Sequence, residues 1–263
     1  MRRTAMMLSV AGLSLAAIFV QSAPAVAKSS GGTTTAVAAY DVSYPQCGVR
    51  LPSGGSTAVV GVTNGLPWSS NPCLASEYGW AAAKPQPAQL YMNTANPETA
   101  SSNWTARAGT GPRACSTADL SDPANPGCAY NYGWNSARDA LSRATAAVGA
   151  AGATHVWWLD VETGNSWNGS VAANAQDLQG SVDYLRSAGV PGVGFYSTSY
   201  QWGVITGGWQ APAGTTGAPA NWIAGAGSAS QAKSWCSPSY SFSGGAVRLV
   251  QYPSGSFDGD YLC

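Results

Sequence analysis

The amino-acid sequence predicts a single α/β domain folded as an irregular, TIM-like β/α barrel. Short apolar runs that favour β-strands alternate with segments whose apolar residues recur at helical spacing, a pattern typical of parallel β/α units. Beyond its first 27 residues, the chain of 263 residues is long enough for one closed barrel. Polar residues also follow the apolar runs, and the catalytic groups of β/α barrels lie at the ends of strands.

The first residues have the pattern of a secretory signal peptide. Arg2 and Arg3 precede an apolar stretch at 5–20, and an A-x-A cleavage sequence ends at Ala27. That stretch is short for a membrane span, and no later stretch approaches the required length, so we expect an extracellular chain without a membrane span. The expected organisation is a signal peptide at 1–27, a flexible Ser/Gly/Thr-rich leader at 28–35 and one barrel domain at 36–263.

Seven runs of β-forming residues are expected to be strands, and each is followed by turn residues. They lie at 36–42, 58–63, 89–93, 154–161, 193–196, 221–224 and 247–252.

Two segments between these runs have a clear helical pattern. In 132–149, apolar residues such as Trp134 and Leu141 recur at helical spacing, and in 171–187 the residues Leu178 and Leu185 belong to one apolar stripe. After position 196 the helical signal weakens while Gly, Pro and Trp become frequent. Some of the late helices of a complete barrel are therefore expected to be absent.

The composition favours an uncharged polar ligand. Charged residues are 9% of the chain, and twelve basic and twelve acidic residues give a formal net charge of zero. Such a chain has no basic patch for nucleic acid or an anionic membrane surface. We expect a monomer that binds a polysaccharide or another glycan and needs no cofactor.

Six cysteines, an even number in an exported chain, predict three disulfides. Six cysteines allow fifteen pairings, and proximity in the sequence favours Cys47–Cys73, Cys115–Cys128 and Cys236–Cys263. No C-x-x-C motif occurs and His155 is the single histidine, which argues against a zinc site. A Ser-His-Asp triad would have to use His155, and no G-x-S-x-G motif supports one.

The run Trp157-Trp158-Leu159-Asp160-Val161-Glu162-Thr163 places two carboxylates in an otherwise apolar strand. Because side chains alternate along a strand, Asp160 and Glu162 share one face, with Cα atoms roughly 6.6 Å apart. Trp158 is expected on the same face and Trp157 on the other. Neighbouring carboxylates oppose each other's ionisation, which raises one pKa and suits general acid catalysis of glycoside cleavage.

Further polar groups end the other predicted strands and are expected to meet this pair. These candidate substrate-binding or catalytic residues are Asp41, Tyr44, Asn64, Asn93, Tyr196, Trp222, Gln251, Asp258 and Asp260. Asp258 and Asp260 are alternatives, because either could be a turn residue of Asp-Gly-Asp; the sequence favours Asp258.

The order of these motifs resembles that of glycoside hydrolase family 25, the lysozymes that cleave peptidoglycan. The matching segments are Asp41-Val42-Ser43 with Gln46, Asp160-Val161-Glu162, Phe195-Tyr196-Ser197 through Trp202, Trp222-Ile223-Ala224 and Val250-Gln251-Tyr252 with the region of Asp258. The resemblance covers most of 40–262.

This resemblance implies a barrel of the (β/α)5(β)3 kind that cleaves a β-1,4 bond after N-acetylmuramic acid. By this analogy, Glu162 is the general acid and Asp160 orients the 2-acetamido group of the substrate as internal nucleophile. Asp41 and Asp258 shape the electric field around the pair, and Tyr196 donates a hydrogen bond at the cleaved sugar.

Two features depart from the family pattern. Asn64 and Asn93 stand where acidic or aromatic groups are expected, and an insert at 96–127 is long for a barrel loop and lies on the side of substrate entry. The longer D-x-x-D-x-D-x-E signature of family 18 chitinases does not match, since Val156 and two tryptophans precede Asp160.

Other interpretations stay open from the sequence alone. Asp160 and Glu162 could cap the next helix or pair with a cation such as Arg248. The whole chain could also be a catalytically inactive barrel that binds glycan or acts as a surface-interaction domain. A protease or esterase would need a nucleophile and base that the sequence does not offer.

Overall fold

The computed structural model describes residues 39–263. The predicted signal peptide (1–27), the leader (28–35) and the predicted start of the first strand at 36 lie outside the described residues. No helix in the described part of the chain is long and apolar enough to cross a membrane.

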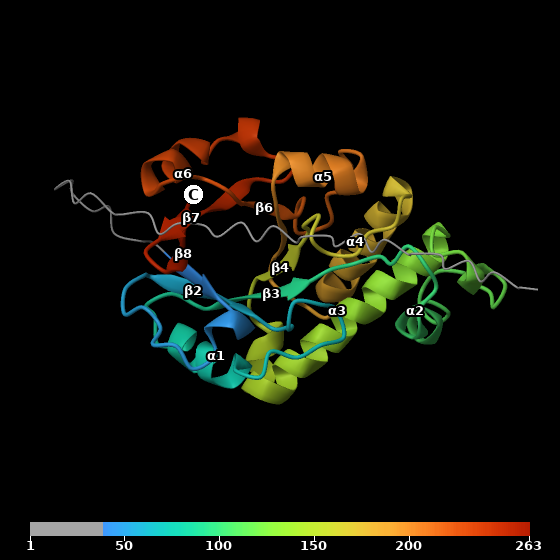
Figure 1. Ribbon diagram of the computed structural model, residues 1–263, viewed down its shortest axis with the longest axis horizontal. Helices are drawn as coiled ribbons and strands as arrows, with labels where there is room; N and C mark the ends of the chain where they lie inside the picture. Colours follow the sequence, from blue (N-terminus) through green and yellow to red (C-terminus); the bar gives the residue numbers. More distant parts are fainter. Residues whose placement is uncertain (1–38) are drawn as a thin grey trace, which may run out of the picture. The chain divides into compact units, whose positions relative to one another are not determined.

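Eight strands form one closed barrel, as the sequence predicts (Figure 1). Neighbouring strands are parallel except for the last, which is antiparallel to both of its neighbours. The strands are β1 (Ala39–Val42), β2 (Thr57–Gly61), β3 (Gln89–Asn93), β4 (Trp157–Asp160), β5 (Val193–Ser197), β6 (Ala220–Ile223), β7 (Val247–Ser254) and β8 (Phe257–Leu262).

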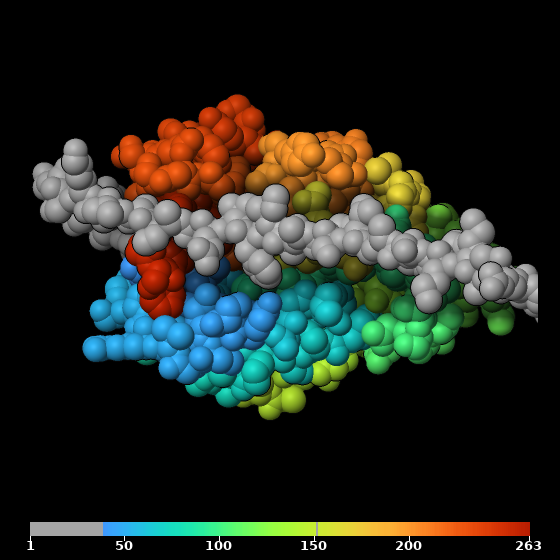
Figure 2. Space-filling model, viewed as in Figure 1, coloured from blue at the N-terminus to red at the C-terminus, as the bar shows by residue number. Residues whose placement is uncertain are grey.

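Strand β8 is not among the seven predicted strands, and it closes the barrel. It follows β7 through a tight turn at Gly255, whose φ of 70° is a left-handed conformation that glycine adopts without strain. β8 then pairs with β1, so that Asp258 lies opposite Asp41. The red C-terminal segment accordingly lies beside the blue N-terminal strands in Figure 2.

The helices lie around the strands in Figure 1. They are α1 (Leu74–Ala82), α2 (Ser102–Arg107), α3 (Pro126–Val148), α4 (Val171–Ser187), α5 (Ser199–Thr206) and α6 (Ala229–Trp235), with short 3-10 turns η1 (Tyr44–Gln46), η2 (Asp119–Ser121), η3 (Gly149–Ala153) and η4 (Pro238–Tyr240).

Helix α4 has the predicted bounds, whereas α3 begins six residues before the predicted start at 132. The earlier start has a local cause. Asn125 accepts hydrogen bonds from the backbone N–H groups of Gly127 and Cys128, and Pro126 occupies the first helical position. After β5, α5 and α6 are short, in line with the weak helical pattern there.

Alternation along the strands separates two apolar cores. Trp157 and Leu159 of β4 pack in the layer between the barrel and the helices. Trp158 points inward, as predicted, and packs with Val59, Trp222 and Leu249 inside the barrel. This inner cluster fills the barrel below Asp160, which is the next inward-facing residue on β4.

The interior holds Trp158 because β5 carries a glycine beside it. A Cβ atom built on Gly194 would lie 2.2 Å from the Trp158 ring, far inside van der Waals contact. No side chain fits between the two strands at this level while the indole stays in place.

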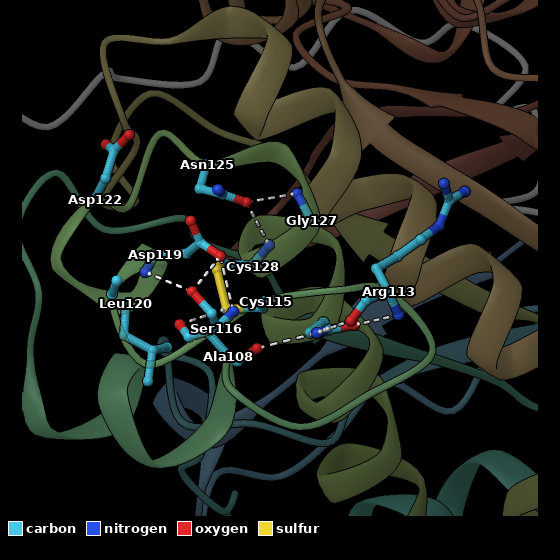
Figure 3. The surroundings of a disulfide bond; sticks show 12 residues. Ala108, Arg113, Cys115, Ser116, Asp119, Leu120, Asp122, Asn125, Gly127 and Cys128 are labelled. Atoms are coloured by element: carbon cyan, nitrogen blue, oxygen red, sulfur yellow. Dashed lines mark hydrogen bonds between the residues drawn. A yellow bond between two sulfur atoms is a disulfide. The ribbon is translucent and has the colours of Figure 1, made fainter.

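The insert is an ordered unit attached to the start of α3 (Figure 3). The Cys115–Cys128 disulfide joins it to the helix, and Asn131 of α3 donates hydrogen bonds to the backbone oxygens of Ala108 and Arg113. Trp104 of α2 is fully buried in a small core of its own with α3. The other disulfides are Cys47–Cys73 and Cys236–Cys263, so all three join the cysteines that are nearest in the sequence.

Replacing Gly194 by Ala should destabilise the barrel by about 1–3 kcal/mol, because the new methyl group overlaps the Trp158 ring and forces it to move. Urea unfolding would measure the change. Gly79→Ala is the matched control, since a Cβ on this glycine of α1 meets nothing within 4 Å. The control should be neutral or stabilising by about 0.5–1 kcal/mol. Equal stability of the two variants would contradict the packing argument.

Candidate active site

Five carboxyl groups gather at the mouth of the barrel formed by the C-terminal ends of the parallel strands. Asp41 comes from β1, Asp160 ends β4, Glu162 follows two residues later, and Asp258 and Asp260 come from β8. Asp160 is electrostatically coupled to both Glu162 and Asp41, and Asp41 in turn to both aspartates of β8. The structure thus brings the predicted acidic residues together.

Asp160 and Glu162 form a pair of neighbouring carboxyl groups, and Asp160 Oδ1 has no N–H or O–H donor among residues 39–263. Asp160 is 5% exposed, whereas Glu162 is half-buried, nearer the solvent. Burial, followed by the charge of Glu162, raises the pKa of Asp160 well above its usual range. The raised pKa that the sequence predicts for one member of the pair is therefore found at the more buried member.

Asn93 and two threonines hold the Asp160 end of this pair. The Asn93 side-chain amide donates a short hydrogen bond to Asp160 Oδ2, and this bond opposes the rise of the Asp160 pKa. Thr63 Oγ1 donates to Asn93 Oδ1 at 2.7 Å, and Thr94 Oγ1 donates to the Asp160 backbone oxygen at 2.5 Å. The two threonines are absent from the predicted site, although both lie next to predicted strand ends.

Asp41 is linked to Tyr196 through Gln251. Gln251 Nε2 donates to Asp41 Oδ2 at 3.1 Å, and the Tyr196 hydroxyl donates to Gln251 Oε1 at 2.7 Å. Burial raises the pKa of Asp41 to about 7, and the negative charge of Asp258 adds to the rise. Gln251 thus bridges two site residues from β1 and β5 in this structure.

The two aspartates of β8 lie at different depths. Both point to the barrel interior because they are two residues apart on one strand. Asp258 is exposed at the mouth, whereas Asp260 is completely buried and accepts a hydrogen bond from Trp222 Nε1 at 2.7 Å. Both candidates left open by the sequence therefore reach the acidic cluster, one on its outer and one on its inner side.

Trp222 does not offer a stacking face for a sugar, which corrects the sequence-based expectation. It is 2% exposed and packs against the rings of Tyr91, Trp158 and Tyr196. The cause is the inward alternation of β6, which places Trp222 in the filled part of the barrel. Its contribution is the hydrogen bond that fixes Asp260.

Three other residues expected to bind substrate, Asn93, Asn64 and Tyr44, lie at different depths in the structure. Asn93 is buried beside Asp160, so it contacts a carboxyl group rather than an open surface. Asn64 is exposed in the loop after β2, where its backbone N–H donates to Ser69 Oγ. Tyr44 follows β1 and keeps 40% of its surface exposed.

No basic residue neutralises the cluster in the part of the chain that the structure describes, where the single salt bridge joins Arg143 to Asp139 on α3. Arg248, considered above as a partner, is exposed and lines a cavity of about 520 Å³ together with Trp158 and Cys263. That cavity lies at the opposite end of the barrel, where β8 ends. His155 is within 2.8 Å of the Tyr78 hydroxyl and takes no part in the site.

Potential metal ligands come together at one place among residues 39–263, and it is outside the acidic cluster. Cys47, Cys73 and Glu77 meet there. The two sulfur atoms are bonded to each other, so neither is a thiolate ligand.

A hollow of about 290 Å³ lies where the loop between β4 and α4 meets α4 and α5, and neither Asp160 nor Glu162 lines it. It is lined by Thr163, Asn165, Trp167 and Asn168 of the loop between β4 and α4, among others. Trp167 Nε1 donates to the Glu162 backbone oxygen at 2.7 Å, which ties this loop to the acidic residue. Glu98 also lines this hollow, so its wall carries a carboxyl group as well as amides and an indole.

Comparison with known sequences points to lysozymes. The family model described as lysozyme-like protein 1 matches residues 133–234, which run from α3 to α6. A probable family 25 lysozyme of Dictyostelium discoideum is 42% identical over 54 residues, a match that covers 20% of this chain and 25% of that protein. The aligned part is therefore a quarter of the relative's length.

Solved structures with the same fold include a lysozyme, a muramidase and the catalytic domain of an endolysin. A lysozyme from Streptomyces coelicolor superposes with a TM-score of 0.55 at 18% identity, covering 88% of this chain and 93% of that one. A muramidase from Trichobolus zukalii gives 0.53 at 16% identity over 87% and 94%. The catalytic domain of the endolysin ply40, from a Listeria monocytogenes phage, gives 0.51 at 17% over 88% and 95%. The chain has the barrel fold of these lysozymes and muramidases.

Proposed function

We propose that the chain is a secreted glycoside hydrolase that cleaves a β-1,4 bond in a peptidoglycan-type glycan. The observation that carries the proposal is the pair of neighbouring carboxyl groups Asp160 and Glu162 at the barrel mouth, close to the further carboxyl group of Asp41. The lysozymes and muramidases among the relatives and solved structures support the choice of a cell-wall glycan.

In the proposed mechanism, Glu162 donates the proton to the leaving glycosidic oxygen. It is the more exposed member of the pair and follows the strand end, whereas Asp160 is buried beneath it. The bond between the anomeric carbon and the leaving oxygen breaks as the proton arrives. In the free protein Asp160 holds the proton of the pair, because burial favours its neutral form. Asp160 passes this proton to Glu162 as Glu162 donates to the leaving oxygen, and both groups are then carboxylates.

Asp160 then orients the 2-acetamido group, whose oxygen attacks the anomeric carbon from the other side. Water opens the resulting ring intermediate, and Glu162, now a carboxylate, takes a proton from that water. Asp41 and Asp258 place negative charge near the developing positive charge on the sugar. The Tyr196 hydroxyl donates its proton to Gln251 in this structure, so it becomes a donor at the cleaved sugar only by exchanging Gln251 for the sugar.

A catalytically inactive, glycan-binding barrel is the alternative. The replacement of the expected groups after the second and third strands by Asn64 and Asn93 favours it, since neither asparagine transfers protons.

Glu162→Gln should lower the hydrolysis rate by at least about a hundredfold, because the amide cannot donate the proton that the leaving oxygen needs. Release of reducing ends from peptidoglycan and chitin oligomers is the measurement. Asp139→Asn, which removes a carboxylate on α3 away from the mouth, is the control and should keep the native rate. An unchanged rate in Glu162→Gln would refute its role. A native protein that binds these glycans and turns none over would support the inactive barrel.

Asn93→Ala should shift the alkaline limb of the pH–rate profile upward. The wild-type rate should fall as pH rises through the apparent pKa of the pair, because the proton to be donated is lost. The Asn93 amide stabilises ionised Asp160, so its removal raises the pKa of Asp160 further. Asn64→Ala is the matched control and should leave the limb in place, since Asn64 is exposed outside the carboxyl cluster. A limb that moves equally in both variants, or downward in Asn93→Ala, would contradict the assignment.

Export should remove the first 27 residues. This expectation rests on the N-terminal pattern and agrees with three disulfides, which persist in oxidising compartments. Full-length chain expressed in an exporting host should appear in the medium and begin at residue 28 on N-terminal sequencing. Leu13→Arg, which interrupts the apolar stretch, should keep the chain inside the cell. Retention of the unchanged chain in the cell with its first 27 residues would refute secretion.

A further inference from the structure

Asp260 carries a buried carboxyl group for which the proposed mechanism has no use. The side chain is completely buried on β8, one pleat deeper in the barrel than Asp258. Trp222 Nε1 donates to one of its oxygens at 2.7 Å. The other oxygen, Oδ2, has no N–H or O–H donor among residues 39–263, and the carboxyl of Asp41 is a close neighbour of Asp260.

The groups around Asp260 are acidic or neutral on every strand packed against it. β1 contributes Asp41, β6 contributes Trp222, β7 contributes Gln251 and Tyr252, and β8 itself contributes Asp258. None of these groups carries a positive charge. An ionised Asp260 would therefore place an uncompensated charge in the interior beside a second carboxylate, an arrangement that proteins avoid.

Two facing carboxyl groups can hydrogen-bond when one of them keeps its proton, because a carboxylate has no donor. We propose that Asp260 is a neutral, protonated positioning residue whose O–H donates to Asp41. Trp222 holds its other oxygen, and Gln251 donates to Asp41 from the opposite side. The donated proton favours the charged form of Asp41 against burial and holds its orientation at the mouth. The inference rests on the proposed function, in which Asp41 belongs to the catalytic cluster.

The environments of the two groups decide which one holds the proton. Asp260 is completely buried, whereas Asp41 is partly exposed and receives the Gln251 amide. Burial, then the charge of Asp41, raises the pKa of Asp260 well above its usual range. The hydrogen bond from Asp260 works in the other direction on Asp41, since it lowers the pKa of that group.

Asp260→Asn and Asp260→Ala form the decisive pair of variants. The amide of asparagine has nearly the shape of a protonated carboxyl, and it can accept from Trp222 while donating to Asp41. Asp260→Asn should therefore hydrolyse peptidoglycan within about threefold of the native rate, whereas Asp260→Ala should lose more than about tenfold, because it leaves buried partners unsatisfied. Equal, large losses in both variants would show that the ionisable carboxyl itself is required and would overturn the proposal.

A stability measurement tests whether Asp260 is protonated in the folded chain, independently of activity. A carboxyl whose pKa is raised on folding binds its proton in the folded chain at pH values where the unfolded chain has lost it, so its contribution to stability falls as pH rises. Between pH 5 and pH 7, the free energy of unfolding should fall more steeply in the native protein than in Asp260→Asn, by a slope equivalent to about one proton. Identical slopes would overturn the proposal.

Infrared spectra give a second readout. Near neutral pH, the difference spectrum of the native protein minus Asp260→Asn should contain the C=O stretch of a protonated carboxylic acid, whereas native minus Asp258→Asn should lack it, since the band of protonated Asp160 cancels in both. Loss of the band in both variants, or in neither, would contradict the assignment to Asp260. A native protein that hydrolyses no glycan but shows this band and the difference in slope would refute the proposed function and leave the protonated Asp260 standing.

Discussion

The direct contact of carboxyl groups without a neighbouring cation is the interaction on which the site depends. Asp160 contacts Glu162, and Asp41 contacts Asp260, in the interior of a narrow barrel. Burial and mutual repulsion both oppose ionisation of these carboxyl groups. Protonation therefore removes their negative charge, as a neighbouring arginine or lysine would compensate it in a salt bridge. A site built in this way keeps carboxyl groups protonated at the barrel mouth. Acid-catalysed cleavage of a glycosidic bond requires such a protonated group.

Two features of the barrel produce this arrangement: β8 closes the sheet against β1, and packed side chains fill the interior. β8 returns antiparallel to β1 and so brings the last acidic residues of the chain to the first strand. Below them, Trp158 and Trp222 exclude water from the interior, and Gly194 leaves the space that the Trp158 ring needs. Neutral amides, Asn93 and Gln251, then donate to Asp160 and Asp41 and limit the rise of their pKa values.

Much of the fold could be read from the sequence where the local pattern and the tertiary environment agree. The bounds of α4 and of β3 are as predicted, since their apolar residues repeat with the period of the element and both have a single buried side or stripe. The start of α3 was placed too late because the pattern of apolar residues begins after the cap, whereas Asn125 and Pro126 set the true start. Trp222 is among the residues expected to bind substrate because the sequence shows its position on the strand but not its depth in the barrel.

The sequence by itself determined the alternation of strands and helices, the shared face of Asp160 and Glu162, and the order in which polar groups reach the strand ends. These are local properties, since they follow from the period of a strand or helix. Only the tertiary structure decided that Phe257–Leu262 is a strand, because its residues lack an apolar run and pair through contacts with β1 and β7. The structure also placed Asp258 at the surface and Asp260 in the interior, and assigned the raised pKa of the pair to Asp160. These differences depend on how deep a residue lies and on which residues lie next to it in space. Neither property leaves a repeating pattern in the sequence.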